Sequence, residues 1–184
     1  MLLKIQKNNR NKQLLKPHKK IILNIIKNIQ IMFAGEIKNN KYNDSLTIYR
    51  TEKISYAGSS KILPFLLRGW IEVLENKYSR AFIQFTDNSR VVWVESIDKK
   101  ILGAICYDYQ EEHRCGWIHL SYTDIDERRK GINKICYKIV ENDCKKLGAT
   151  HLSSMVNMKN KMRLDSSASV GMIPTHYKMY KKIE

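Results

Sequence analysis

The 184-residue chain is long enough for one domain with a modest extension, and its 43% of hydrophobic and 28% of charged residues are typical of a globular protein. It contains no run of 18 apolar residues, so no membrane-spanning helix is predicted. Its formal net charge of +15 favours anionic partners such as nucleic acid, membrane surfaces or phosphorylated cofactors.

Much of the positive charge lies at the N-terminus. Residues 1–35 hold eight basic residues and no acidic one, and the polar segment 39–44 separates this stretch from the rest. We therefore expect a basic N-terminal extension over residues 1–40 and a domain over residues 45–184. The extension could be a disordered tail or an amphipathic surface helix. It could also be a non-native stretch upstream of a true start codon at Met32, and the sequence does not decide among these alternatives.

The first part of the domain begins with a strand and continues with helix. Leu46–Ile54 is rich in strand-forming residues. Apolar residues then recur at helical spacing from Ile62 to Leu74, after the cap signal in residues 58–60, which predicts a long helix. A short second helix is expected over Ser79–Phe85, before a turn at residues 87–89.

Three strands follow in quick succession. They are expected at Val91–Ser96, Ile101–Tyr109 and Gly116–Thr123. Because short polar turns join them, these strands should form an antiparallel meander.

The spacing of the apolar residues becomes helical again from Ile132 to Leu147, and Gly148 follows as a typical helix terminator. The remaining expected elements are a strand, a short helix and a last strand, at Thr150–Asn157, Lys159–Ser169 and His176–Ile183. The strands before and after the long helix should be parallel, with a right-handed crossover. The expected fold class is α/β, a mixed and mostly antiparallel sheet flanked by helices with one parallel strand pair.

The cysteines and histidines do not form a recognisable metal motif. The four cysteines include no CxxC pair, and Cys136 and Cys144 lie on the predicted helix, where they should pack as small hydrophobes. His113, Cys115 and His119 are close in sequence, but no second ligand pair follows at zinc-finger spacing. We expect no bound metal, reduced thiols and a cytoplasmic location.

The segment from Asp126 to Lys134 carries the strongest chemical signal, because it follows a strand and opens a helix. Gly131 lets the backbone approach a ligand, and the free N–H groups of a first helical turn form an anion site suited to phosphate. Cations are unfavourable at this end of a helix unless an anion binds there. Four basic residues surround this predicted helix start, namely Arg128, Arg129, Lys130 and Lys134. The competing interpretation is a basic helix start that binds nothing.

The residues Arg128-x-x-Gly131-x-Asn133 resemble the acetyl-CoA loop of the GNAT N-acetyltransferase superfamily, written Q/R-x-x-G-x-G/A. Asn133 stands where the family has Gly or Ala, so its side chain must be turned aside. The expected element order over residues 45–184 is also the family's order. Asn160 matches the asparagine after the fifth strand, and Gly171-Met172 resembles the Gly-Phe after the next helix.

This resemblance implies that acetyl-CoA is the co-substrate and that an amine is the acceptor. The strand before the loop would offer backbone groups to the pantetheine arm, the loop would line the pyrophosphate, and Asn160 would lie near the sulfur. The cofactor-binding residues so implied are Ser121, Tyr122, Thr123, Arg128, Arg129, Lys130, Gly131, Ile132, Asn133, Lys134 and Asn160.

Acetyl transfer requires a neutral amine. Deprotonating a lysine amine, with a pKa of ~10.4, costs about 4.6 kcal/mol at pH 7, so a base or a water chain must take the proton. His119, on the strand that leads to the loop, is the first candidate, and some family members carry a histidine at that place. A histidine that merely fills a strand face is the alternative.

The departing thiolate needs a second group, one that gives it a proton or a hydrogen bond. Many family members use a tyrosine seven residues beyond the asparagine, where this chain has Ser167. Ser167 is the candidate for a hydrogen bond to the sulfur, and Tyr177 or Tyr180 are possible substitutes from the last strand. Positioning, with backbone polarisation of the thioester, is the alternative that needs no acid.

The acceptor is not readable from the sequence; candidates for its side of the site are Arg68, Trp70, Glu72, Glu75 and Glu95. The leading function is acetyl transfer to an amine of a protein, peptide or small molecule. A basic nucleic-acid-binding protein is one alternative, supported by residues 1–35 but without a recognition motif. A catalytically degenerate domain that binds acyl-CoA is the other, supported by Asn133 and Ser167.

Overall fold

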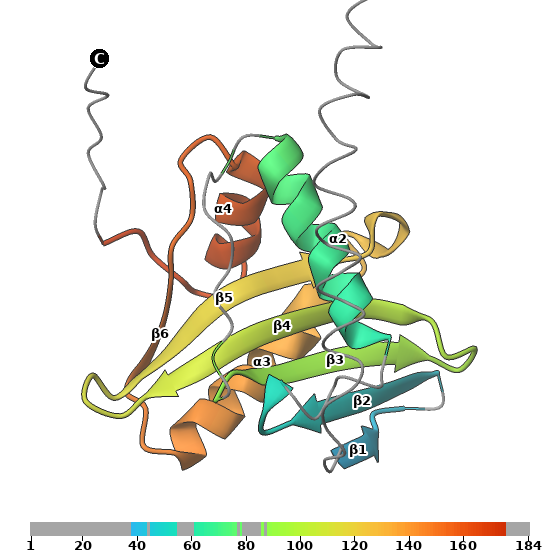
Figure 1. The fold of residues 1–184 in the computed structure, drawn as a ribbon, viewed down its shortest axis with the longest axis horizontal. Helices are drawn as coiled ribbons and strands as arrows, with labels where there is room; N and C mark the ends of the chain where they lie inside the picture. The colour runs from blue at the N-terminus through green and yellow to red at the C-terminus, as the bar shows by residue number, and fades with distance from the viewer. Residues whose placement is uncertain are drawn as a thin grey trace, which may run out of the picture.

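The computed structural model describes residues 38–43, 45–54, 61–76, 78, 86 and 88–175. Its centre is a six-stranded sheet in which the spatial order of the strands is their order along the chain (Figure 1). The strands are β1 (Lys38–Lys41), β2 (Leu46–Thr51), β3 (Arg90–Ser96), β4 (Ile101–Gln110), β5 (Cys115–Thr123) and β6 (His151–Ser154).

Neighbouring strands from β1 to β5 are antiparallel, whereas β5 and β6 are parallel. The helix α3 (Ile132–Lys146) connects the parallel pair. A parallel pair requires such a crossover, because the chain must return to the same end of the sheet. The predicted meander and the predicted parallel pair are both confirmed, and so is the mixed α/β class.

Helices cover the two faces of the sheet, as Figure 1 shows for α2 (Ile62–Glu75) in front and α3 behind. The apolar stripe of α2 buries Phe65 and Leu66 against one face, beside Trp93. On the other face Cys136 and Val140 of α3 are buried in a second cluster. The sheet is therefore covered on both sides, which explains why β3 and β4 are almost continuously apolar. The short helix α4 (Lys161–Ala168) contacts α3.

The sheet begins earlier than expected. Lys38–Lys41 form β1 and pair with β2, although the sequence placed this stretch in the extension and in its polar break. The correction has a physical reason, since β1 is the last strand on its side of the described sheet. Such an edge strand need not be apolar.

Other boundaries also differ. β2 ends at Thr51 and β6 at Ser154, so both strands are shorter than predicted. The expected elements at Ser79–Phe85 and His176–Ile183 lie outside the described residues, as do the cap signal in residues 58–60 and residues 1–37.

All four cysteines are buried, and Cys136 and Cys144 pack in the layer under α3 as predicted. Burial raises the pKa of Cys136 to about 12, so this thiol stays protonated at neutral pH. Within the described ranges, no helix is long and apolar enough to cross a membrane, and no group of three or more potential metal ligands gathers.

Candidate active site

The strands β5 and β6 part in the middle of β5. Their last paired residues are Ile118 and Ser154, whereas β5 continues to Thr123. On this side, residues 119–123 therefore have no strand partner in the described part of the chain. The backbone groups of this segment that do not bond to β4 are available to a ligand, apart from the carbonyl of Thr123, which accepts from Arg128. The edge leads directly into the loop before α3.

A β-bulge in β5 determines where His119 points. Cys106 of β4 pairs with Leu120, but the next residue, Tyr107, pairs with Ile118, so His119 is the extra residue. Leu120 belongs to the apolar cluster under α2 and Ile118 to the cluster under α3. The bulge thus interrupts the regular alternation of side chains at His119.

His119 lies beside Asp108 of β4, with its Nε2 atom 2.8 Å from Oδ2 and both side chains mostly buried. The distance is that of an ion pair when the ring is protonated, but the ring N–H is not aligned as a regular hydrogen bond. Burial opposes ionisation of Asp108, yet the close His119 and a hydrogen bond from Ser89 outweigh it. The pKa of Asp108 is therefore lower than usual. A carboxylate fixed at this distance is placed to stabilise a protonated imidazole ring.

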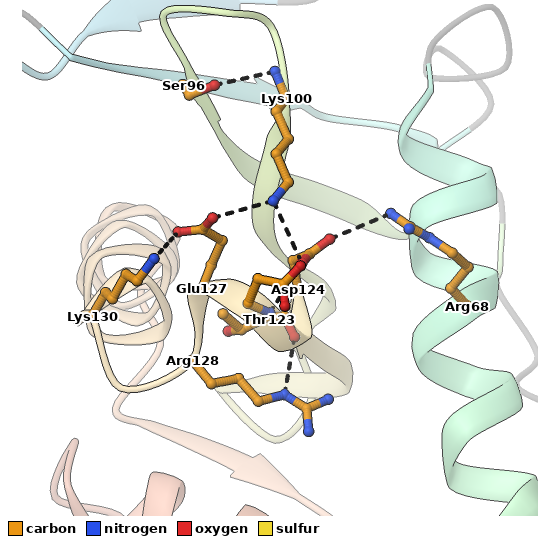
Figure 2. A network of polar contacts seen from close by, with 9 residues as sticks. Arg68, Ser96, Lys100, Thr123, Asp124, Glu127, Arg128 and Lys130 are labelled. Carbon is orange, nitrogen blue, oxygen red and sulfur yellow. Dashed lines mark hydrogen bonds and ion pairs between the residues drawn. The ribbon is translucent and has the colours of Figure 1, made fainter.

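The loop between β5 and α3 is anchored by ion pairs to α2 and to the β3–β4 turn, and by one ion pair within the loop, as Figure 2 shows. Asp124, the first residue of this loop, is buried. Its Oδ1 lies 3.7 Å from Nζ of Lys100 in the β3–β4 turn, and its Oδ2 lies 3.9 Å from Nη2 of Arg68 in α2. Glu127, at the end of the short 3-10 helix η2 (Ile125–Glu127), lies 3.0 Å from Lys130 and 3.2 Å from Lys100. Hydrogen bonds from these two lysines lower the pKa of Glu127, so the anchor is charged at neutral pH.

Arg128 joins the loop to α2. Its Nη2 atom lies 2.6 and 2.8 Å from the two carboxylate oxygens of Glu72, and its Nε donates to the carbonyl oxygen of Thr123 at 3.3 Å. The guanidinium group also lies 5.8 Å from the ring centre of Tyr122. Contacts within the protein therefore occupy this side chain, which leaves the backbone of Arg128 as the part more suited to a ligand.

We expect Arg128→Ala to lower the free energy of unfolding by about 1–2 kcal/mol. Hydrogen bonds to charged partners contribute about 1.5–3 kcal/mol, and partial exposure reduces this value. Urea denaturation followed by circular dichroism measures the change. Lys138→Ala is the matched control, because its pair with Glu141 is exposed on α3 and should contribute less than about 0.5 kcal/mol. Equal effects of the two variants would contradict a structural role for Arg128.

The helix α3 begins with unpaired backbone donors. Its first hydrogen bond runs from the N–H of Ile135 to the carbonyl of Gly131, so the N–H groups of residues 132–134 have no helical acceptor. No side chain caps this end, and its first turn contains no acidic residue. A methyl group placed on Gly131 would meet no atom within 4 Å. The open, positive end of a 15-residue helix fits a pyrophosphate group.

The backbone just before α3 is in an unusual conformation. Arg129 has φ of 64° and Gly131 has φ of 81°, both in the left-handed region. This region is readily available to glycine but uncommon for a side chain such as that of arginine. Strain of this kind often accompanies ligand-binding loops, and here it turns the chain sharply into the helix.

The four basic residues around the start of α3 divide into two that form ion pairs and two that form none among the described residues. Arg128 is bound to Glu72 and Lys130 to Glu127, as described above. Arg129 and Lys134 are exposed, and in the part of the chain that the structure describes neither forms an ion pair. These two side chains are therefore the cations best placed to meet an incoming anion at the start of α3.

The side chain of Asn133 is turned away from the backbone donors. Its Oδ1 accepts a hydrogen bond from Ser121 Oγ at 2.6 Å, and its Nδ2 donates one to Ser166 Oγ at 2.7 Å. It thus bridges β5 and α4. Its two hydrogen bonds go to Ser121 and Ser166, and none goes to the N–H groups at the start of α3.

On α4, Asn160 and Ser167 have different surroundings. Asn160 caps the helix, because its Oδ1 accepts a hydrogen bond from the N–H of Arg163 at 3.0 Å. Ser167 is buried, and its hydroxyl has no partner among the described residues. One turn earlier, Arg163 donates from Nη2 to the hydroxyl of Tyr137 at 2.6 Å, while its buried Nη1 is also without a partner in that set.

The sequence-predicted residues therefore fall into two regions. The loop, Ser121 and Asn133 come together at the start of α3, and Ser167 lies on α4 beside them, next in sequence to Ser166. His119 pairs instead with Asp108, a residue that sequence reasoning missed. Tyr177 and Tyr180 lie outside the described residues. Four of the acceptor-side candidates take part in contacts within the domain, namely Arg68, Trp70, Glu72 and Glu95.

Comparisons with known proteins identify the family and the fold. Residues 60–164 match the family model described as the acetyltransferase (GNAT) family. No curated protein sequence matches the chain.

Solved structures share the fold. An aminoglycoside acetyltransferase, meta-AAC0020, from an uncultured soil metagenomic sample is 16% identical with a TM-score of 0.59, and the match covers 78% of this chain and 100% of that one. A putative acetyl transferase from Pyrococcus furiosus is 13% identical with a TM-score of 0.56, covering 75% and 99%. AAC(6')-Iy, bound to a bisubstrate analog of CoA, is 12% identical with a TM-score of 0.51, covering 76% and 98%. Because the family model spans more than half of the chain, this protein belongs to the GNAT acetyltransferase family and is an acyltransferase.

Proposed function

We propose that this protein transfers an acetyl group from acetyl-CoA to an amine, and that the start of α3 holds the cofactor's pyrophosphate. The observation that carries the proposal is the uncapped start of α3, where three backbone N–H groups and an open Gly131 lie at the end of the loop. The unpaired edge of β5, residues 119–123, supplies backbone groups for the pantetheine arm. When bound, the cofactor supplies an activated acetyl thioester.

In this proposal His119 takes the proton from the attacking amine. Asp108 supports it, because a carboxylate with a lowered pKa remains charged and stabilises the protonated ring. Because Nε2 of the ring faces Asp108, Nδ1 is the ring nitrogen that remains for the amine. Ser167 is the candidate on the thiolate side, since its buried hydroxyl is a donor without a partner in the described residues.

The acceptor is an amine of a protein, a peptide or a small molecule. Two of the structural neighbours above are described as aminoglycoside acetyltransferases or as a complex with an acetylneamine analog. At 16% identity or less, that likeness extends to the fold, so it does not select an aminoglycoside as the acceptor here.

The direct test has two stages. Calorimetry with acetyl-CoA measures binding, and a thiol assay measures CoA release with a panel of amines that includes peptides, polyamines and aminoglycosides. Binding followed by amine-dependent CoA release supports the proposal. Binding without release across the panel supports a degenerate acyl-CoA-binding domain, and no binding refutes both.

The division of charges in the loop gives a sharper prediction. We expect Arg129→Ala and Lys134→Ala each to weaken acetyl-CoA binding about two- to fivefold, because one exposed charge near a helix end contributes about 0.5–1 kcal/mol. Lys130→Ala should have a smaller effect, since Glu127 already neutralises this lysine. Calorimetry at low and high salt measures both effects, which should shrink as salt screens the charges. A larger loss for Lys130→Ala than for the other two would contradict this assignment.

A further inference from the structure

We propose that Asn133 is a positioning residue that fixes α4 against the start of α3 and the unpaired edge of β5. This inference rests on the proposed acetyl transfer and names one more residue that the reaction needs. It gives a role to the position at which the chain departs from the family motif.

The contacts of Asn133 connect three elements through one amide group. Ser121 lies in the half of β5 that has no partner on the β6 side, and it donates to Asn133 Oδ1 at 2.6 Å. Asn133 lies in the first turn of α3 and donates from Nδ2 to Ser166 of α4 at 2.7 Å. Both hydrogen bonds are short and partly buried, and both ends of the amide are satisfied. Glycine or alanine at this position has no atoms with which to make the bridge.

The position of α4 matters because of what this helix carries. Ser167 follows Ser166 directly, and its buried hydroxyl has no partner within the described residues. Arg163 lies four residues before Ser167, hence on the same side of the helix, and its buried Nη1 is likewise without a partner there. Two buried donors on one side of a helix are costly unless an acceptor uses them. The bridge through Asn133 sets the distance of both donors from β5.

The reaction supplies an acceptor for such donors. The amine nitrogen bonds to the acetyl carbon as the C–S bond breaks, and the electron pair of that bond remains on sulfur. The amine proton passes to His119, and the sulfur leaves as a thiolate that hydrogen-bond donors stabilise. A displacement of about 1 Å in such groups can lower a rate by about 100-fold. Asn133 therefore acts through α4 and exchanges no proton itself.

The test is Asn133→Ala, which restores a residue typical of the family. We expect the acetyl-CoA Kd to stay within about threefold of the native value, because the backbone donors of α3 remain, while kcat falls about tenfold or more. Ser166→Ala should have the same effect. The double variant should be no worse than either single one, because both remove one bridge. Ser166→Thr, which keeps the hydroxyl, is the matched control and should retain most of the native kcat.

The opposite outcome is equally clear. If Asn133 only obstructs the motif, Asn133→Ala should bind acetyl-CoA more tightly and keep its full kcat, and that result would overturn the inference. Failure of the proposed function is a separate result, since the native protein would then release no CoA. In that case amide hydrogen exchange tests whether Asn133 fixes α4. Faster exchange across α4 in both alanine variants, but not in Ser166→Thr, supports the bridge, and unchanged exchange overturns it.

Discussion

Replacing His119 with alanine should lower kcat for acetyl transfer by about 100- to 10,000-fold, the range expected for loss of a general base. The acetyl-CoA Kd should change less than about twofold, because the predicted cofactor donors lie on the loop and α3. Calorimetry and steady-state kinetics with one amine acceptor separate these quantities. A variant that binds acetyl-CoA normally and keeps its full rate would show that another group, or water, accepts the proton.

Asp108→Asn tests the same pair from its other side. The amide keeps the shape but removes the charge that stabilises protonated His119, so kcat should fall by at least about tenfold.

The pKa of Asp108 is lower in the folded protein than its ordinary value. Its ionised form therefore adds stability at pH values above the ordinary aspartate pKa of about 3.9, and this contribution disappears as the pH falls through the lower folded value. The Asp108→Asn variant should thus be less stable than the native protein at pH 7, and this difference should vanish in strong acid. A difference that does not shrink as the pH falls below the ordinary aspartate pKa of about 3.9 would contradict the assigned charge.

A tryptophan in place of Gly131 should weaken acetyl-CoA binding by at least about 100-fold. A side chain on this residue would extend into open space at the start of α3, next to the N–H groups of residues 132–134 in the chain, and a group as large as indole is expected to cover them. Each hydrogen bond to a charged group contributes about 1.5–3 kcal/mol, so blocking two of them accounts for the loss. Calorimetry with acetyl-CoA measures the change directly.

Gly131→Ala separates obstruction from backbone strain. Both variants must adopt φ of 81°, which disfavours any side chain by about 1 kcal/mol, but alanine is too small to cover the donors. We expect Gly131→Ala to lose stability like the tryptophan variant while its affinity falls less than about tenfold. Native-like affinity in Gly131→Trp would place the cofactor elsewhere.

Much of the fold follows from local patterns in the sequence. The spacing of apolar residues predicts α2 and α3, and the polar turns predict where β3, β4 and β5 begin and end. For these elements the local sequence alone indicates which side is buried. β1 was missed because a polar edge strand carries no such period, and its pairing with β2 gives it its structure. The shorter β6 reflects the same limit, since a strand ends where its partner diverges, and β5 diverges after Ile118.

The candidate site was predictable where a backbone motif defines it. The loop, Gly131 and the start of α3 follow from the order of strand, glycine and helix. The contacts of side chains across elements did not follow. Arg128 lies 56 positions from Glu72 in the chain, so nothing in the motif indicates that the arginine binds α2. Asp108 was missed because a bulge, which has no sequence signature here, determines its approach to His119.

If the start of α3 holds acetyl-CoA as proposed, its lack of a cap also links folding to metabolism. A helix without a capping side chain or an acidic first turn lacks an interaction that typically contributes about 1 kcal/mol. On the proposed function, the cofactor supplies that missing cap, and a ligand that binds only the folded chain adds about 2.7 kcal/mol at 100 times its Kd. The melting temperature would then rise with the acetyl-CoA concentration. The lifetime of the protein in a cell would follow the acetyl-CoA supply, because degradation acts on the unfolded fraction.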